Sequence, residues 1–203
     1  MFVSLMPYME TKNDNLKPQE SLELIAAMIN QAKGNIGRSS FYFLLWGWVI
    51  AICNFSMYGI FKFSSFPQYA PFVWILVVPA WIATVIYANK QQKQKGATTH
   101  LDEINKWLWI TMAISILPVW FFGAQLNWMI NAIVMMPIGS ATFLSGIILR
   151  FRPLILGGIT FWLAGIACYL VNPTEQILIG GLAVLLGYLI PGYMLKNQRE
   201  NNV

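Results

Sequence analysis

Long apolar stretches without Asp, Glu, Lys or Arg alternate along this chain with short polar islands. The five charge-free stretches hold 23, 27, 43, 22 and 20 residues and cover positions 39–61, 63–89, 107–149, 153–174 and 176–195. A helix that crosses the hydrocarbon core of a bilayer needs about 20 apolar residues. Four of the stretches are therefore long enough for one crossing each, and the third is too long for a single crossing.

The stretch 107–149 would form a helix of roughly 65 Å at about 1.5 Å per residue, twice the thickness of the hydrocarbon core. It must fold back, and FFGAQLN at 121–127 is the predicted turn because its Gly, Gln and Asn favour a break in the helix. The pattern then predicts six transmembrane helices. Their ranges are 40–62, 69–89, 106–122, 128–149, 154–172 and 176–195.

The composition favours a membrane protein over a water-soluble one. Charged residues make up 10% of the 203 residues and apolar residues 57%, whereas charged residues are about 25% of ordinary soluble chains. Strands are not expected, because the apolar runs are continuous and an open sheet edge is unstable in lipid. The predicted fold class is an all-α polytopic membrane protein.

The basic residues predict the orientation of these helices. If the N-terminus is cytoplasmic, the inner islands hold 12 of the 13 Lys and Arg residues, and Lys62 alone lies outside. Cytoplasmic loops of membrane proteins carry such an excess of Lys and Arg. We therefore predict a multi-pass protein of the inner (cytoplasmic) membrane with both termini cytoplasmic. The net charge of +5 follows from this topology and does not indicate a nucleic-acid partner.

A stretch before the first crossing has the periodicity of an amphipathic helix. PQESLELIAAMINQAK at 18–33 begins with a proline suited to a first helical turn and places Leu22, Ile25 and Ile29 on one side. This side is a candidate face for a partner, which is either the membrane surface, the protein's own cytoplasmic side or a second protein. GNIG at 34–37 is a candidate hinge to the first crossing.

The ends of the fourth and sixth predicted helices resemble one another. ATFLSGIILR at 141–150 and GYLIPGYMLK at 187–196 share small residues at their first and sixth positions and end on a cation. The resemblance indicates three helical hairpins. A homo-oligomer is a further candidate assembly.

The sequence divides into three predicted segments. They are an N-terminal cytoplasmic segment 1–38, a transmembrane domain 39–196 and a cytoplasmic tail 197–203.

The sequence offers no residues for catalysis, for a cofactor or for a metal. No ionisable residue lies well inside a predicted crossing, and Lys62 and Glu175 lie at outer ends. An ionisable group at depth costs at least about 2.5 kcal/mol, so its presence would have indicated function. The single His100 and the separate Cys53 and Cys168 do not form a metal-ligand set. We therefore predict a protein that is not an enzyme.

Several uncharged polar residues remain inside the predicted helices. Such residues either form hydrogen bonds between helices or line a polar pocket, and the second reading makes Asn54 and Asn131 part of a pocket for a neutral solute. The candidate residues are Asn54, Thr84, Ser115, Asn131, Thr142 and Ser145.

Three stretches of the sequence are distinctive: residues 21–49, the loop NKQQKQKG and the ending LLGYLIPGYMLK at 185–196. They resemble a family of small, uncharacterised bacterial integral membrane proteins common in Bacteroidetes. The resemblance implies a membrane location and six helices and carries no activity. Two function hypotheses follow: a non-enzymatic regulatory or assembly subunit that acts through helix–helix and cytoplasmic contacts, and a small carrier or channel for a neutral or apolar solute.

Overall fold

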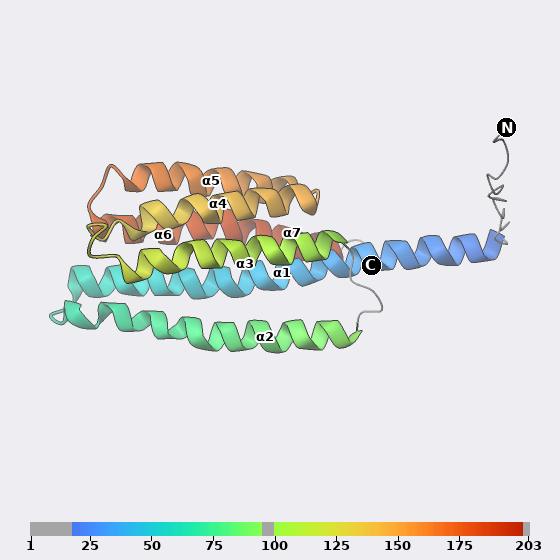
Figure 1. Ribbon diagram of the computed structural model, residues 1–203, viewed down its shortest axis with the longest axis horizontal. Coiled ribbons are helices and arrows are strands. Elements are labelled where there is room, and N and C mark those ends of the chain that lie inside the picture. The colour runs from blue at the N-terminus through green and yellow to red at the C-terminus, as the bar shows by residue number, and fades with distance from the viewer. Residues whose placement is uncertain (1–17, 95–99, 201–203) are drawn as a thin grey trace, which may run out of the picture. The chain divides into compact units, whose positions relative to one another are not determined.

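The computed structural model describes residues 18–94 and 100–200 (Figure 1), and no β-strand occurs in this part of the chain. The absence of strands agrees with the predicted all-α fold class. The elements in chain order are α1 (Pro18–Phe63), the 3-10 helix η1 (Pro67–Leu76), α2 (Val77–Gln94), α3 (His100–Phe121), α4 (Ile130–Ile148), α5 (Arg152–Cys168), α6 (Pro173–Val184), the π-helix η2 (Leu185–Leu189) and α7 (Ile190–Glu200).

Five helices are long and apolar enough to cross a membrane. They coincide with five of the six predicted crossings, so the chain has the architecture of a multi-pass membrane protein. The remaining crossing was predicted at 154–172, but α5 ends at Cys168 and has 17 residues. The five helices are Ser40–Phe63, Pro67–Gln91, Asp102–Phe121, Ile130–Ile148 and Pro173–Asn197.

The predicted N-terminal helix does not end near residue 33. Residues 18–33 are helical, but α1 continues through 34–37 to Phe63, so the expected hinge is itself helical. Gly34 and Gly37 each cost a helix only about 1 kcal/mol relative to alanine, and each further residue adds a backbone hydrogen bond. The chain divides into two compact units between Asn35 and Ile36.

Several sequence predictions lie outside the described part of the structure. The structure describes the backbone but not the side chains at 18–39, which include the candidate face Leu22, Ile25 and Ile29. Residues 1–17, residues 95–99 of the basic loop and residues 201–203 of the tail are not described at all. The partner face therefore remains a prediction.

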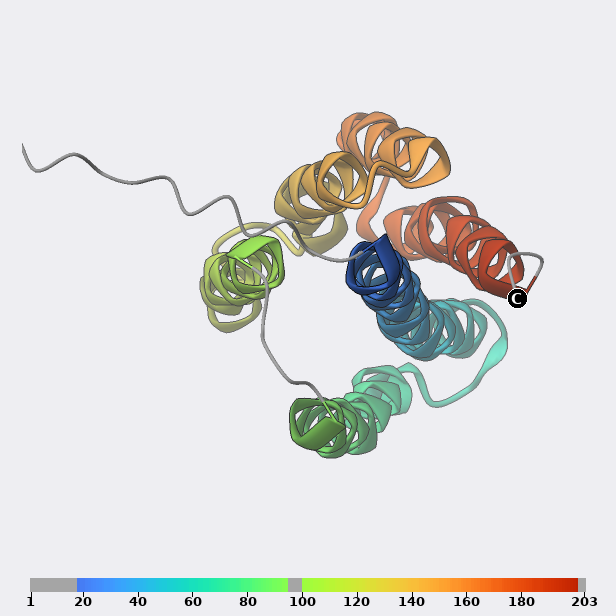
Figure 2. The same ribbon diagram turned by 90° about the vertical axis from the view of Figure 1, so that its right-hand side faces the viewer.

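Within the unit 36–203, the helices run antiparallel as three consecutive hairpins (Figure 1). The hairpins are α1 with η1–α2, α3 with α4, and α5 with α6–α7. Seen end-on, α1 lies between α2 and the α6–α7 segment (Figure 2), and α4 packs along α5. The final residues of α2, α4 and α7 and the first residues of α3 and α5 lie at one end of these hairpins, so Lys90, Lys106, Arg150, Arg152 and Lys196 belong to that end and Lys62 to the other.

The turn between α4 and α5 is short and has a definite hydrogen-bond pattern. The N–H of Phe151 donates to Gly146 O at 2.9 Å, and the N–H of Arg150 donates to Ile147 O at 3.1 Å. This is the Schellman pattern that ends many helices, and it requires a left-handed residue, here Arg150 with φ of 51°. The turn after α3 also ends on left-handed residues, Asn127 and Trp128, where FFGAQLN predicted it.

Two segments depart from α-helical geometry, and proline accounts for part of both departures. In η1, Pro71 cannot donate the backbone hydrogen bond that an α-helix needs at that position, and ten residues adopt the tighter 3-10 form. In the last crossing, Pro191 leaves the carbonyl of Gly187 without its usual N–H donor, and the π-helix Leu185–Leu189 precedes it. The hydrophobic pattern does not report either departure.

In the core of the unit 36–203, glycines allow the backbones of α4, α5 and the α6–α7 segment to pack closely. A Cβ atom at Gly158 would lie 2.8 Å from Gly139 O, and one at Gly157 would lie 2.4 Å from Gly187 O. Such backbone approach is how helices associate in lipid, where apolar burial supplies no driving force. Buried Leu154 and Phe161 fill the space beside these contacts.

Candidate functional site

Two asparagines from different hairpins converge on one glycine in the interior of the bundle. A Cβ atom at Gly180 of α6 would lie 3.0 Å from Asn54 Oδ1 of α1 and 3.2 Å from Asn131 Oδ1 of α4. The two oxygens therefore lie within twice a hydrogen-bond length of each other. We call Asn54, Asn131 and Gly180 the amide site.

Asn54 presents a buried acceptor to the amide site. The residue is 2% exposed, its Nδ2 donates to Ile50 O of its own helix at 2.9 Å, and its Oδ1 has no hydrogen-bond partner. The bond to Ile50 fixes the amide orientation, because exchanging the oxygen and nitrogen would place two oxygens against each other. Asn131 is half-buried and is the second residue of α4.

Gln176 adds a second buried acceptor one helical turn before Gly180. Its side chain is 0% exposed, its Nε2 donates to Val171 O at 3.4 Å, and its Oε1 has no partner. Residues four apart share a face of a helix, so Gln176 and Gly180 face the same side of α6. A buried acceptor without a donor costs about 1–3 kcal/mol, which makes these two oxygens unusual features of the core.

Glycine at position 180 is what allows the asparagines to approach. Any side chain there would contact both oxygens and also Met135 Cε, which lies 3.3 Å from the position of a Cβ atom. Gly180 offers only its Cα–H, a weak donor, to the two acceptors. The amide site is thus rich in acceptors and poor in donors.

Thr142 and Ser145 lie in a second polar cluster nearer the other end of α4. Trp109 Nε1 donates to Ser145 Oγ at 3.1 Å, and Ser145 Oγ donates to Asn105 Oδ1 at 2.8 Å. The hydroxyl of Thr142 donates to Ile138 O at 2.7 Å. The cluster joins α3 to α4 by completed hydrogen bonds.

The hydroxyl of Tyr188 extends this second cluster to the π-helix. It lies 3.4 Å from Thr142 Oγ1, and the ring packs against Phe161 at 4.8 Å between centroids. Phe43 and Trp109 contact the other sides of the ring. Tyr188 is therefore held by aromatic packing on several sides and links α1, α3, α4 and α5.

Thr84 and Ser115 are not brought to the amide site. Thr84 is half-buried and accepts a hydrogen bond from Trp46 Nε1 at 3.1 Å, which ties α2 to α1. Ser115 is exposed on α3 and donates to Thr111 O of the same helix at 2.8 Å. Of the six candidate polar residues, the structure groups Asn54 with Asn131 and Thr142 with Ser145.

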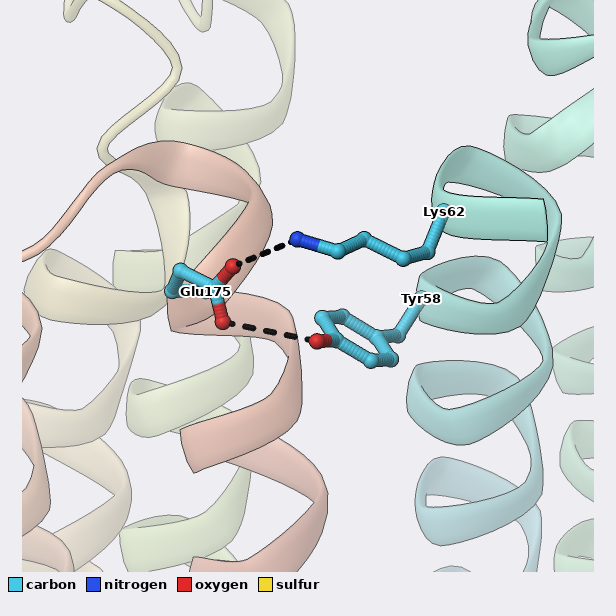
Figure 3. A network of polar contacts seen from close by, with 3 residues as sticks. All are labelled: Tyr58, Lys62 and Glu175. Atoms are coloured by element: carbon cyan, nitrogen blue, oxygen red, sulfur yellow. Dashed lines mark hydrogen bonds and ion pairs between the residues drawn. The ribbon is translucent and has the colours of Figure 1, made fainter.

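A small charged network lies at the end of the bundle that carries Lys62 (Figure 3). Lys62 Nζ lies 3.3 Å from Glu175 Oε1, and the Tyr58 hydroxyl donates to Glu175 Oε2 at 3.5 Å. Lys62 is in the last turn of α1 and Glu175 in the first turn of α6, where the helix dipoles favour each charge. Because the two side chains are 50% and 39% exposed, the pair adds little stability.

The described residues contain no group of three or more His, Cys, Asp or Glu side chains that could hold a metal ion. The two cysteines, Cys53 and Cys168, are buried and unbonded to each other. Gln176 was not singled out from the sequence, and the Gly180–Gly181 pair indicated close helix contact but not a contact with the asparagines. The spacing of four between Gln176 and Gly180 within a charge-free stretch was the available signal, but it did not show that Gly180 faces two asparagines.

Comparisons with protein-family models, with curated proteins and with solved structures find no match to this chain. In the described part of the chain, the fold is that of an all-helical, multi-pass membrane protein with two buried polar clusters.

Proposed function

We propose that this chain is a six-crossing protein of a bacterial inner membrane that is not an enzyme and acts as a regulatory or assembly subunit through helix and cytoplasmic contacts. The observation that carries the proposal is the uneven packing of the helices. In α4 and in the last crossing, 39% and 56% of the apolar window is buried in the protein, against 11% in the second crossing and 6% in α3. The second crossing and α3 thus offer most of their surface to lipid or to another protein.

The hydrogen bonds between α3 and α4 and the glycine contacts between helices also support a function in binding other proteins. Lys62 and Glu175 form an ion pair at one end of the bundle, and among the described residues no Asp, Glu, Lys, Arg or His lies deep in a crossing. A proton relay or a hydrolytic site in the membrane would need such groups. The apolar side of 18–33, formed by Leu22, Ile25 and Ile29, is the proposed cytoplasmic contact.

Six crossings and cytoplasmic termini form the topological part of the proposal. A 17-residue helix reaches about 25 Å at 1.5 Å per residue, so α5 is at the lower limit for a crossing. The grouping of Lys90, Arg150 and Lys196 at one end supports the orientation, because cations are retained on the cytoplasmic side.

Impermeant thiol labelling checks this topology. We expect Gln68→Cys and Asn172→Cys to react from outside intact spheroplasts, and Lys90→Cys and Arg152→Cys to react only after lysis. Cys53 and Cys168 are buried and keep the background low. Labelling of Arg152→Cys and Asn172→Cys from the same side would remove the α5 crossing, and the reverse pattern throughout would invert the protein.

Photo-crosslinking in native membranes tests the contact function. We expect crosslinkers at Leu22, Ile25 and Ile29 to capture one defined protein in near-stoichiometric yield, and that protein to co-purify without crosslinking. A crosslinker at Gln31 is the matched control, because it lies on the opposite side of the helix at about 3.6 residues per turn. Equal capture from Gln31, or no capture combined with solute flux in liposomes of the purified protein, would contradict the proposal.

A small carrier or channel for a neutral solute is the second candidate function. The amide site favours it, because Asn54 and Asn131 face each other across Gly180 with a buried acceptor that the protein does not satisfy. Three consecutive hairpins also agree with the repeats found in many transporters. The flux measurement above distinguishes this candidate from the first.

A further inference from the structure

We propose that the amide site binds one small neutral hydrogen-bond donor of about the size of water. This inference is independent of both candidate functions, because a bound donor is compatible with a contact subunit and with a carrier. It goes beyond the polar pocket expected from Asn54 and Asn131 by stating the ligand's chemistry.

The hydrogen-bond inventory of Asn54 leaves one buried acceptor without a donor. Asn54 is 2% exposed, its Nδ2 is already bonded to Ile50 O, and its Oδ1 has no partner. Asn54 Oδ1 and Asn131 Oδ1 both lie within 3.2 Å of the position of a Gly180 Cβ atom, and Met135 Cε lies 3.3 Å from it. Two acceptors that converge in this way match a ligand that donates to both.

The geometry limits the size of this ligand. Because each oxygen lies within 3.2 Å of the position of a Gly180 Cβ atom, the two oxygens are close enough for one donor group beside Gly180 to bridge them. A methyl group at Gly180 would already contact both oxygens, so the space does not extend over the glycine. Water, or the –OH or –NH2 end of a small solute, fits this arrangement.

The surroundings favour a neutral ligand over a cation. Among the described residues, Glu175 is the acidic residue nearest to Gly180 along α6, and its carboxylate is paired with Lys62 and bonded to Tyr58. A cation held by amide oxygens alone would be an uncompensated charge in a low-dielectric interior. Asn131, the second residue of α4, is half-buried, so the site is less enclosed on its side than at Asn54.

Water-edited solid-state NMR on the full chain in liposomes tests the proposal. We expect rapid magnetisation transfer from water to the side-chain amide of Asn54, and loss of this transfer in Asn131→Leu. Thr142, which is fully buried in the second cluster, gives the reference for a dry polar group, and Ser115→Ala is the control variant. Transfer to Asn54 as slow as transfer to Thr142 would overturn the proposal.

Titration with urea and with glycerol distinguishes the sources of the donor. A saturable loss of the water signal at Asn54, with a chemical-shift change at Asn131, identifies a solute as the ligand. A water signal unchanged by either compound identifies water itself.

A measurement of folding stability tests the proposal independently, because a bound and an unbound Asn54 Oδ1 predict stability changes of opposite sign. Leucine has nearly the shape of asparagine but no hydrogen-bond acceptor, so Asn54→Leu removes this oxygen. We expect it to lower the folding equilibrium constant about tenfold if a donor is bound there. An increase of about tenfold would show that the oxygen is unsatisfied in the folded protein and would overturn the proposal.

Discussion

Replacing Gly158 with alanine is expected to lower the free energy of unfolding by about 3 kcal/mol or more, the upper part of the range for overpacking. The new Cβ atom would lie 2.6 Å from Phe143 Cβ, 2.7 Å from Phe143 N and 2.8 Å from Gly139 O. Two of these atoms belong to the backbone of α4, so a rotamer change cannot relieve the contact. The α4 and α5 backbones would have to separate, which would weaken contacts along their whole length.

Gly59→Ala is the matched control for this prediction. Gly59 is also inside a helix, but no atom lies within 4 Å of the position of its Cβ. Alanine favours a helix by up to about 1 kcal/mol over glycine, so this variant should be slightly more stable than wild type. Unfolding by SDS in mixed micelles measures both variants. Equal losses of stability in the two would show that the α4–α5 contact is not as close as the structure has it.

The large effect of a single methyl group follows from the solvent. In lipid the unfolded helices remain surrounded by apolar chains, so burying an apolar side chain gains little. Stability then depends on close packing and on hydrogen bonds between helices. The glycines that face other helices allow the close packing, and Trp109, Asn105 and Ser145 supply some of the hydrogen bonds between helices.

Much of the fold could be predicted from the sequence because length and charge are direct signals for a membrane helix. The starts of four long helices, at residues 40, 67, 102 and 130, lie within four positions of the predicted ones. The turn in the stretch 107–149 was also found, because one helix of that length cannot fit a bilayer. These predictions needed no knowledge of side-chain contacts.

The features that decide the candidate site depend on contacts between distant residues. The sequence indicated that Asn54 and Asn131 are polar residues in apolar helices, but it could not show that both face Gly180. Ser115 has the same chemistry and lies on the exposed side of α3. A rotation of one helix by a single residue, about 100°, exchanges these two environments, and the hydrophobic pattern of a membrane helix does not specify this rotation.

The irregular segments were missed for a related reason. The π-helix Leu185–Leu189 and the 3-10 helix Pro67–Leu76 lie inside continuous charge-free stretches of the sequence, like the α-helical parts of the same crossings. Pro71 and Pro191 indicate a disturbed hydrogen bond, but the form of the disturbance depends on packing. In the last crossing, the Gly187 carbonyl lies against Gly157 of α5, so the two helices and the π-helix form one packed unit.

Phe161→Ala tests this packed unit, and we expect it to lower the free energy of unfolding by about 2 kcal/mol or more. Phe161 is 1% exposed, and its Cε2 atom lies 2.5 Å from where a Cβ atom of Gly187 would be. It also contacts Tyr188 edge-to-face. In lipid the hydrophobic transfer contribution is small, so the loss comes from the cavity and from the aromatic contact.

Leu163→Ala on the same helix is the matched control for this prediction. Leu163 is 63% exposed and has the position of a lipid-facing residue, so its truncation leaves no cavity and should change the free energy of unfolding by less than about 0.5 kcal/mol. The same SDS titration measures both variants. A loss in Leu163→Ala as large as the loss in Phe161→Ala would show that the effect does not come from the contacts that Phe161 makes inside the bundle. A loss below about 0.5 kcal/mol for Phe161→Ala would instead show that α5 and the π-helix are not packed against each other.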